Sequence, residues 1–392
     1  MPWGEVTVVS GRLEFVKLAT QPGANVRDVC RRFGISPKTG YKWVGRHAAQ
    51  GTEGMVDRSR RPQHSPGRSE EALEHRVVEL RDRYPDWGGR KLRALLLSEG
   101  LEGVPTASTI TEILRRYERL DPARAGKPHA WQRFEHEAPN QLWQMDFKGD
   151  FALVDIRRSR CHPLTILDDH SRYGLCLLAC ANQQQETVKE ALTNVFRRYG
   201  LPLRITADNG SPWGNTTTKT MTSLGVWLAR LGIKLGHSRP FHPQTQGKDE
   251  RFHRTLKAEL LVRQSFDSIA SAQVAFDAWR DRYNFIRPHE ALGLVPPVSR
   301  YQPSLRVFPE VLPPIEYDRA DAVRKVQDHG HVSFRGQTYK VGAGLVGMPV
   351  ALRKLPGEEA WDVFFCSVWL TRISLLGAVS QLADVGAQGR IV

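Results

Sequence analysis

The feature that most constrains the fold of this chain is a change of hydrophobic periodicity that begins at residue 141. Three apolar segments follow one another closely, and each has the length and the residue types of a β-strand. Helices and short strands then alternate, which predicts an α/β sheet covered by helices on both faces. A long helical stretch from residue 247 to about residue 284 is expected to close this domain. In chain order the segments are LWQMDFKGDFALV, HPLTILDDHSR, YGLCLLACA, QETVKEALTNVFRRYG, LPLRITAD, TTKTMTSLGVWLARLG and IKLGHSRP.

Three acidic residues stand on separate elements of this predicted sheet. Asp146 lies in the first strand, where a buried charge is costly unless a metal ion or a partner compensates it. Asp208 follows the fourth strand, and ligand sites in α/β sheets favour such strand ends. Glu250 stands near the start of a helix, after a loop that contains glycine. Taken singly, the three are compatible with a salt-bridged strand residue, a turn or cap residue, and a first-turn glutamate. Together they predict a carboxylate site for two Mg²⁺ or Mn²⁺ ions, as phosphodiester transfer without a covalent enzyme intermediate requires.

Helical geometry separates the neighbours of Glu250. Asp249 is the rival acid, but on a helix it points about 100° away from Glu250. Arg254 and Lys257 follow Glu250 by four and seven residues, so they share its face and are expected to meet DNA phosphates. A solvated basic helix face is the alternative. The acidic pair at residues 168–169 falls in a predicted hairpin turn and is left outside the set of three.

The front of the chain has the pattern of a helix-turn-helix. Residues 11–50 are predicted to form three short helices, with Gly34 in the turn, Ser36 as the cap of the third helix and Pro37 at its first position. That third helix carries polar side chains suited to phosphates and base edges, and other side chains that can pack against the domain. The polar set is Lys38, Thr39, Lys42 and Arg46, and the packing set is Tyr41, Trp43 and Val44. A plain three-helix bundle with a solvated basic face is the alternative.

An arginine-rich segment and a second helical unit follow. Arg58, Arg60 and Arg61 are predicted to lie in an extended arm along the DNA backbone or in a minor groove. Residues 69–120 have the pattern of a second, degenerate helix-turn-helix, which can equally be a packing or dimerisation module.

Charge points to a polyanionic partner. Lys and Arg number 56 against 42 Asp and Glu, a formal net charge of +14, so the surface should attract nucleic acid. The scattered cysteines predict neither disulfides nor zinc, because Cys176 and Cys180 share one face of a predicted strand as buried small side chains. Neither a signal sequence nor a membrane span is expected, so the cytoplasm, in association with the nucleoid, is the expected location.

Three segments carry a resemblance to a known family. TADNGSPW, FHPQTQGKDERFHRTLK and YNFIRPHEALGLVPPVSRY resemble the integrase core shared by retroviral integrases and bacterial insertion-sequence transposases. The front end resembles the single-frame transposases of that group, and the resemblance extends from about Gly11 to Tyr301. It implies an RNase H-like fold, a Mg²⁺-dependent triad of Asp146, Asp208 and Glu250, and cut-and-join chemistry on DNA ends. The 41 residues between Asp208 and Glu250 exceed the usual family spacing, which puts the loop after Asp208 in question.

We therefore predict a multidomain DNA transposase that acts on transposon ends and target DNA, and works as at least a dimer. A catalytically silent DNA-binding regulator and an RNase H-like nuclease are the alternatives. The intact set of three acids argues against the first, and the two front-end units argue against the second. The predicted parts are a helix-turn-helix domain at 1–56, a basic arm at 57–68, a second helix-turn-helix-like domain at 69–120, a linker at 121–140, an α/β RNase H-like core at 141–305, and a small C-terminal β-barrel and tail at 306–392.

Overall fold

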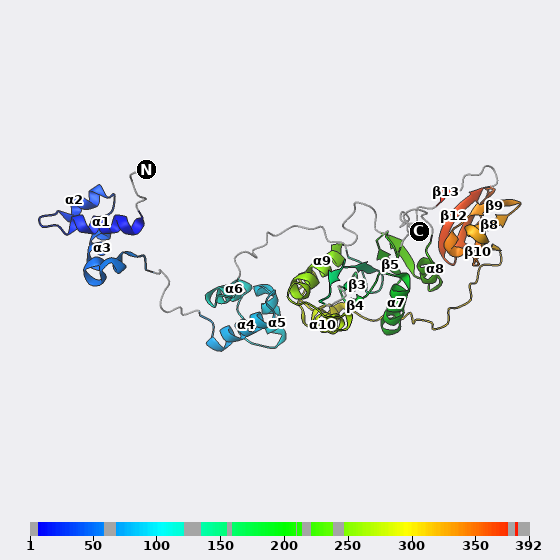
Figure 1. Cartoon of the computed structure of the whole chain (residues 1–392), viewed down its shortest axis with the longest axis horizontal. Coiled ribbons are helices and arrows are strands. Elements are labelled where there is room, and N and C mark those ends of the chain that lie inside the picture. Colours follow the sequence, from blue (N-terminus) through cyan, green and yellow to red (C-terminus); the bar gives the residue numbers. More distant parts are fainter. Residues whose placement is uncertain are drawn as a thin grey trace. The chain divides into compact units, whose positions relative to one another are not determined.

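In the computed structural model of this protein, the chain folds into two compact units (Figure 1). The first comprises residues 1–69 and the second residues 70–392. Arg60, Arg61 and most of the predicted linker at 121–140 lie outside the described residues. The structure describes residues 7–58, 68–120, 135–154, 159–208, 210–213, 221–237, 247–374 and 381–382.

The first unit is a small helical domain around a compact core. Gly34 has a φ of +64°, which the turn before the third helix requires. Ser36 caps that helix by accepting a hydrogen bond from the amide of Thr39, and Pro37 occupies its first position, as predicted. The elements are α1 (Val8–Ala19), α2 (Val26–Arg32), α3 (Pro37–Gln50) and the 3₁₀ helix η1 (Gly51–Met55). Their core contains Phe15, Val16, Ala19, Val29, Cys30, Trp43 and Met55.

One packing prediction for α3 is wrong. Trp43 is buried and Val44 is half-buried, but the side chain of Tyr41 is 55% exposed. Residues that are two positions apart on a helix are separated by about 200°, so Tyr41 and Trp43 point to nearly opposite sides. Tyr41 therefore belongs to the outer face of α3 and not to its packed side.

The second helical unit has three helices with a core of its own. Gly89 allows the second and third of them to cross closely, because a Cβ there would lie 2.3 Å from the carbonyl oxygen of Ala107. Thr106 caps the third helix by accepting a hydrogen bond from the amide of Thr109. Ion pairs join this unit to the rest of the chain, Asp86 with Arg263 at 2.7 Å and Arg90 with Glu290 at 3.8 Å. The helices are α4 (Glu71–Arg83), α5 (Gly89–Ser98) and α6 (Ala107–Arg116).

A mixed β-sheet forms the centre of the compact unit at residues 70–392. Strand β1 pairs antiparallel with β3, which pairs antiparallel with β4, while β5 runs parallel to β1 and β6 parallel to β5. This arrangement of three antiparallel strands and two parallel ones agrees with the expected RNase H-like core. The strands are β1 (Trp143–Phe147), β2 (Phe151–Ala152), β3 (Arg160–Asp168), β4 (Gly174–Cys180), β5 (Arg204–Ala207) and β6 (Lys234–His237).

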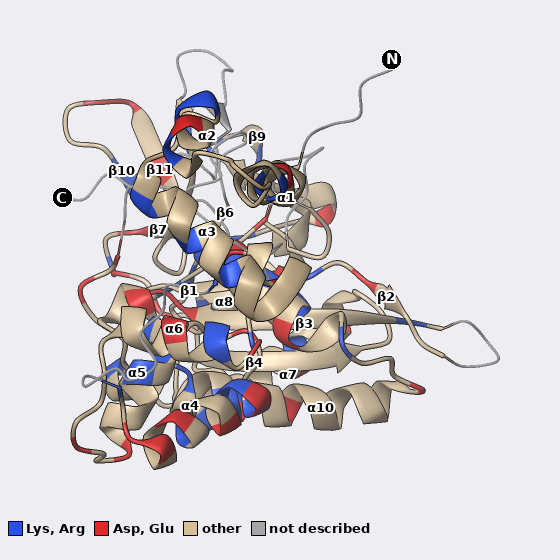
Figure 2. Cartoon of the chain, turned by 90° about the vertical axis from the view of Figure 1, so that its left-hand side faces the viewer, with Lys and Arg blue, Asp and Glu red and all other residues tan. Residues whose placement is uncertain are grey.

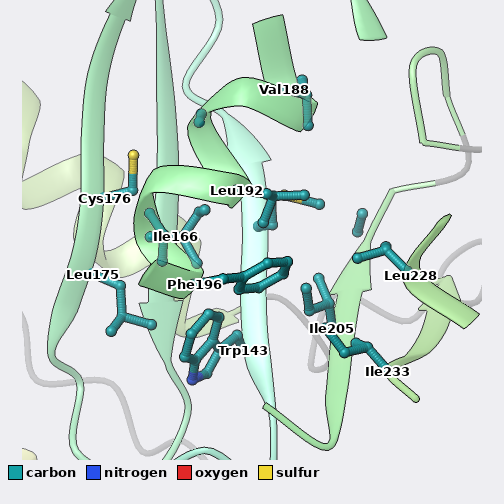
Figure 3. Close-up of a cluster of buried hydrophobic side chains, with 14 of the residues drawn as sticks. Trp143, Ile166, Leu175, Cys176, Val188, Leu192, Phe196, Ile205, Leu228 and Ile233 are labelled. Carbon is teal, nitrogen blue, oxygen red and sulfur yellow. The ribbon is translucent and has the colours of Figure 1, made fainter. Parts of the chain in front are cut away.

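Helices cover both faces of this sheet, as the alternation of helices and strands predicted. On one face α7 (Gln185–Tyr199) and α8 (Ser223–Arg230) pack on the odd-numbered side chains of β1, including Trp143 (Figure 3). On the other face α9 (Gly247–Leu256) and α10 (Ile269–Asp281) pack on side chains of β3 and β4. Because side chains alternate along a strand, the even-numbered residues of β1 face α9.

The long closing helix is interrupted, unlike the predicted continuous stretch. The helix of α9 continues as a π-helix, η4 (Lys257–Leu261), and the chain then leaves the helical path to bury Phe266. Ser268 restarts it with a capping box on α10, which continues as the π-helix η5 (Arg282–Ile286). Asn284 fastens this end to the sheet by hydrogen bonds to both backbone groups of Gly174, at 2.8 and 3.0 Å.

The C-terminal β-barrel is not confirmed. Among the described residues, five strands form one open antiparallel sheet in the order β13-β12-β11-β10-β7, beside a separate β8-β9 hairpin. Val226 and Ala229 of α8 belong to the same hydrophobic core as the buried side chains of these strands, so α8 covers part of the sheet. The strands are β7 (Ala322–Lys325), β8 (His331–Phe334), β9 (Gln337–Lys340), β10 (Pro349–Lys354), β11 (Ala360–Phe365), β12 (Val368–Ser374) and β13 (Gln381–Leu382).

Two smaller predictions concern cysteines and membrane spans. Cys176 and Cys180 are buried in the same hydrophobic cluster, and all five cysteines are free. Burial raises the pKa of the Cys180 thiol to about 11. Within the described part of the chain, no helix has both the length and the apolar character needed to cross a membrane.

Candidate active site

The sheet brings Asp146 and Asp208 to neighbouring strand ends. In the parallel pairing of β1 and β5, Trp143 lies opposite Ile205 and Gln144 opposite Thr206. The same register, continued by two residues, sets Asp208 beside Asp146. Trp143 and Ile205 are both in the core under α7, so the alternation of side chains directs both acids to the face that α9 covers.

Helix α9 turns its two adjacent acids in different directions. Glu250 is exposed, whereas Asp249 is buried, with 1% of its surface exposed. This difference agrees with the helical separation of the two residues predicted from sequence. Glu250 lies close enough to Asp146 for its charge to raise the pKa of that carboxyl group.

Asp249 reaches into a buried polar network under the sheet face. Thr165 Oγ1 lies 3.2 Å from Oδ1 of Asp249 and 2.8 Å from Nε2 of His253, one helical turn further along α9. The ligand atoms of Asp146, Asp249 and His253 all lie within 4.8 Å of one another. This cluster shares Asp146 with the predicted set of three, but it contains Asp249 and His253 in place of Asp208 and Glu250.

The electrostatics of the site reflect burial among like charges. Burial raises the pKa of Asp146 to about 6, and the carboxylates of Asp208 and Glu250 act in the same direction. Burial also raises the pKa of Asp249 well above its ordinary value. His253 changes in the opposite direction, because burial and then the charge of Lys148 lower its pKa to about 3.

Basic side chains lie on or directly after the elements that carry Asp146 and Glu250. Arg254 and Lys257 are exposed, as expected for residues on the face of Glu250. The charge of Lys257 acts on Lys148, which follows β1 and also lies near Asp146; burial and Lys257 together lower the pKa of Lys148. The π-helix begins at Lys257, so the regular helical spacing from Glu250 ends there.

Asp168 and Asp169 accept hydrogen bonds from residues on the segments around the site, and Asp169 also forms an ion pair. Asp168 accepts hydrogen bonds from the amides of Asn140 and Ser171, at 2.7 and 2.8 Å. Asp169 accepts a hydrogen bond from Gln144 Nε2 at 2.9 Å and forms an ion pair with Lys248. Through these contacts Asp169 ties the start of α9 to β1.

Gln144 completes this attachment of α9. Its side-chain oxygen accepts a hydrogen bond from the amide of Asp249 at 3.2 Å, on the same face of β1 as Asp146. The first turn of α9 is therefore held by Gln144 and Asp169.

The predicted DNA-contact residues of the first unit differ in their surroundings. Lys38 and Lys42 are exposed. The hydroxyl of Thr39 lies 2.9 Å from that of its cap, Ser36, so it takes part in the helix start. Arg46 is half-buried, and Arg58 donates a hydrogen bond to Gln50 at 2.7 Å.

Sequence reasoning missed the buried network of Thr165 and His253. Thr165 lies in the middle of an apolar strand, and its pairing with Asp146 depends on the register of two strands. The one available signal was the four-residue spacing of Asp249 and His253, which places both on one face of a helix.

Comparison with protein families assigns domains to this chain. Residues 136–243 and residues 231–297 each match an integrase core domain family. Residues 12–63 match a helix-turn-helix domain family, and residues 39–114 match a homeodomain-like domain family. Residues 321–377 match the C-terminal domain of the IS481 family transposases.

Two relatives come from bacterial insertion elements. An uncharacterized 31.7 kDa protein of insertion element IS407 from Burkholderia multivorans is 29% identical over 239 residues, which cover 59% of this chain and 81% of that protein. A putative transposase of insertion sequence element IS5376 from Geobacillus stearothermophilus is 23% identical over 357 residues, covering 88% of this chain and 83% of that protein.

Among solved structures, the HTLV-2 integrase catalytic core domain in complex with magnesium, in its trimeric form, gives a TM-score of 0.32 at 14% identity. The alignment covers 42% of this chain and 99% of that one. The TM-score and the sequence identity both describe a distant resemblance.

Proposed function

We propose that this chain, a transposase of the bacterial insertion-sequence type with an integrase-like core, binds the ends of its element and joins them to target DNA. The reaction is a metal-dependent cleavage of phosphodiester bonds followed by strand transfer. One observation carries the proposal: two acids on neighbouring strands, Asp146 and Asp208, face a helix that presents Glu250, within the segment that matches the integrase core.

The donor set of this site fits a hard divalent cation. Mg²⁺ and Mn²⁺ prefer carboxylate oxygens, and the carboxylates of Asp208 and Glu250 lie close enough to Asp146 to raise its pKa. These three residues would hold the metal, and we propose two ions. When bound, such ions activate the attacking oxygen and stabilise the leaving oxygen of the phosphodiester.

The chain's own residues position the DNA and the carboxylates. Arg254 and Lys257 are exposed beside Glu250, where they can contact phosphates of a bound DNA end. Gln144 and Asp169 hold the first turn of α9, so that Glu250 keeps its place relative to β1. Thr165, on β3, supports the same helix through its contacts with Asp249 and His253.

The other proposals concern the front end and the assembly. The first helical unit, with Lys38, Lys42 and the arm that begins at Arg58, binds the terminal sequences of the element. Because two ends must be cut and joined and each chain carries one set of three acids, the protein works as at least a dimer on DNA. We also propose the domain boundaries predicted from the sequence, from the helix-turn-helix domain at 1–56 to the C-terminal part at 306–392.

The experiment uses full-length protein and labelled duplexes taken from the two sequences that flank its gene. With Mg²⁺ or Mn²⁺ and a plasmid target, we expect cleaved ends and joined products, and with EDTA we expect neither. A labelled RNA–DNA hybrid serves as the second substrate. Specific end binding without cleavage in either metal would support a silent regulator, and digestion of the RNA strand alone would support a nuclease. Each of these two results would overturn the proposal.

A further inference from the structure

Four residues form one exposed face of α3. Lys38, Tyr41, Lys42 and Gly45 are all exposed, and at about 100° per residue they fall within one arc of about 100°. The helix contains no acidic residue, and Figure 2 shows basic positions along it. This face is therefore complementary in charge to a polyanion.

The two glycines inside α3 differ in what the fold requires of them. A Cβ at Gly40 would lie 2.3 Å from Sγ of Cys30 and 2.9 Å from Cζ of Phe15, so helix packing requires glycine there. A Cβ at Gly45 would meet nothing within 4 Å. Glycine is a poor residue for a helix interior, so the folded domain gains nothing from Gly45. What the missing side chain does provide is close access to the helix backbone from outside.

Arg46, the arginine of α3, packs against the core of its own domain. The guanidinium groups of Arg12 and Arg46 lie 4.0 and 5.0 Å from the ring centroid of Trp43, and the ammonium group of Lys42 lies 4.2 Å from it. Arg46 is half-buried, so this cation–π contact holds its guanidinium group against the core, whereas Lys42 remains exposed. Tyr41, with 55% of its surface exposed, is then the large side chain that α3 presents outward.

We propose that Tyr41 and Gly45 are the sequence-reading positions of α3, which enters the major groove of the element-end DNA. Gly45, in the middle of the exposed face, lets the helix approach the base edges closely. Tyr41 contacts the bases with its ring and hydroxyl, while Lys38 and Lys42 contact the flanking phosphates. Arg46 supports the helix by packing on Trp43 and reads no base. The inference rests on the proposed function, since it names the residues by which the transposase recognises its ends.

The test starts from sequence selection. Full-length protein is used to enrich a pool of duplexes with a randomised central segment, and the enriched duplex and a scrambled one become the probes. We expect Gly45→Ala and Gly45→Leu to bind the enriched duplex about tenfold and about a hundredfold more weakly, in order of side-chain volume, while their binding to the scrambled duplex is unchanged. Their unfolding temperatures should equal or exceed that of the wild type, because both residues are better helix formers.

Matched variants separate reading from folding and from charge. Gly40→Ala should unfold the domain, and Lys17→Ala, on the exposed side of α1, should leave the preference for the enriched duplex unchanged. Tyr41→Ala should lose preference as Gly45→Leu does, whereas Arg46→Ala should weaken binding to both duplexes equally. Preference retained by both Gly45→Leu and Tyr41→Ala would overturn the inference. Failure of the wild type to enrich any sequence would instead overturn end recognition in the proposed function.

Discussion

Thr165 Oγ1, on strand β3, lies 3.2 Å from Oδ1 of Asp249, the residue that precedes Glu250 on α9. Thr165 is also the register partner of Asp146 on β1, and its hydroxyl lies 3.0 Å from the carbonyl oxygen of Asp146. One hydroxyl group therefore connects the strand that carries one acid of the proposed triad with the helix that carries another.

Removal of that hydroxyl should disturb the metal site without touching a proposed ligand. Thr165→Val keeps the side-chain volume but leaves Asp249 and His253 without this buried partner. We expect strand transfer to fall on the order of tenfold to a hundredfold, the range seen for residues that orient metal ligands, with a higher Mg²⁺ concentration needed for half the maximal rate. Strand transfer measured over a Mg²⁺ series gives both quantities.

Two conservative variants control this experiment. Thr165→Ser keeps the hydroxyl and should behave as the wild type. Asp249→Asn keeps the side-chain volume and one of the two acceptor oxygens, so it should retain most of the strand-transfer activity. If Asp249→Asn were as inactive as Glu250→Gln, Asp249 would be a ligand and our assignment of the triad would be wrong.

The triad itself is expected to be indispensable for chemistry but not for binding. Asp146→Asn, Asp208→Asn and Glu250→Gln each remove one carboxylate charge, so each should abolish strand transfer. The front end is unchanged in these variants, so a gel-shift measurement on element ends should give nearly wild-type affinity. Glu190→Gln, an exposed acid on α7, is the matched control and should remain active. Full activity in any triad variant would remove that residue from the site.

Part of this site followed from the sequence alone because it depends on local patterns. Asp146 and Asp208 sit at strand ends that periodicity locates, and helical spacing is enough to turn Glu250 away from Asp249. The capping of α3 by Ser36 is also local, since it involves residues within one turn.

Other features depend on contacts between distant segments, and the sequence did not reveal them. The network of Thr165 requires the register of β1 and β3 together with the packing of α9. Tyr41 does not lie on the predicted packed side of α3, because Trp43 and Phe15 belong to the core of its domain and Tyr41 does not. The C-terminal strands form an open sheet instead of the expected barrel, and distant α8 supplies part of its core.

A half-buried lysine on the second helical unit, Lys91 of α5, should make stability depend on pH. Burial lowers the pKa of Lys91 to about 8, and the charge of Arg287 acts in the same direction. Below pH 8 the side chain is charged in both the folded and the unfolded chain, and the folded state bears the cost of desolvation. As the pH rises from about 8 toward the ordinary lysine value of 10.5, the folded protein loses the proton first, so its stability rises.

Lys91→Met removes this charge and tests the effect. We expect the free energy of unfolding to increase by on the order of 1–3 kcal/mol at pH 7, with a smaller difference at pH 10. Thermal unfolding of the wild type and the variant at both pH values measures it. Lys17→Met, on the exposed side of α1, is the control. A difference between Lys91→Met and the wild type that does not change with pH would contradict the proposed burial of this charge.

The last prediction concerns which protomer cuts which DNA end. If one protomer binds an end that its partner cleaves, two defective proteins should complement each other when mixed. Glu250→Gln lacks catalysis but keeps its front end, and Lys38→Ala/Lys42→Ala keeps the catalytic site but weakens end binding. We expect each to be inactive alone at limiting protein, and their mixture to recover part of the strand transfer, because some mixed dimers pair an intact front end with an intact active site. A mixture that stays inactive at every ratio, although mixed dimers are detected by differential tagging, would show that each protomer cuts the end it binds. Light scattering that found only monomers on paired ends would contradict the assembly itself.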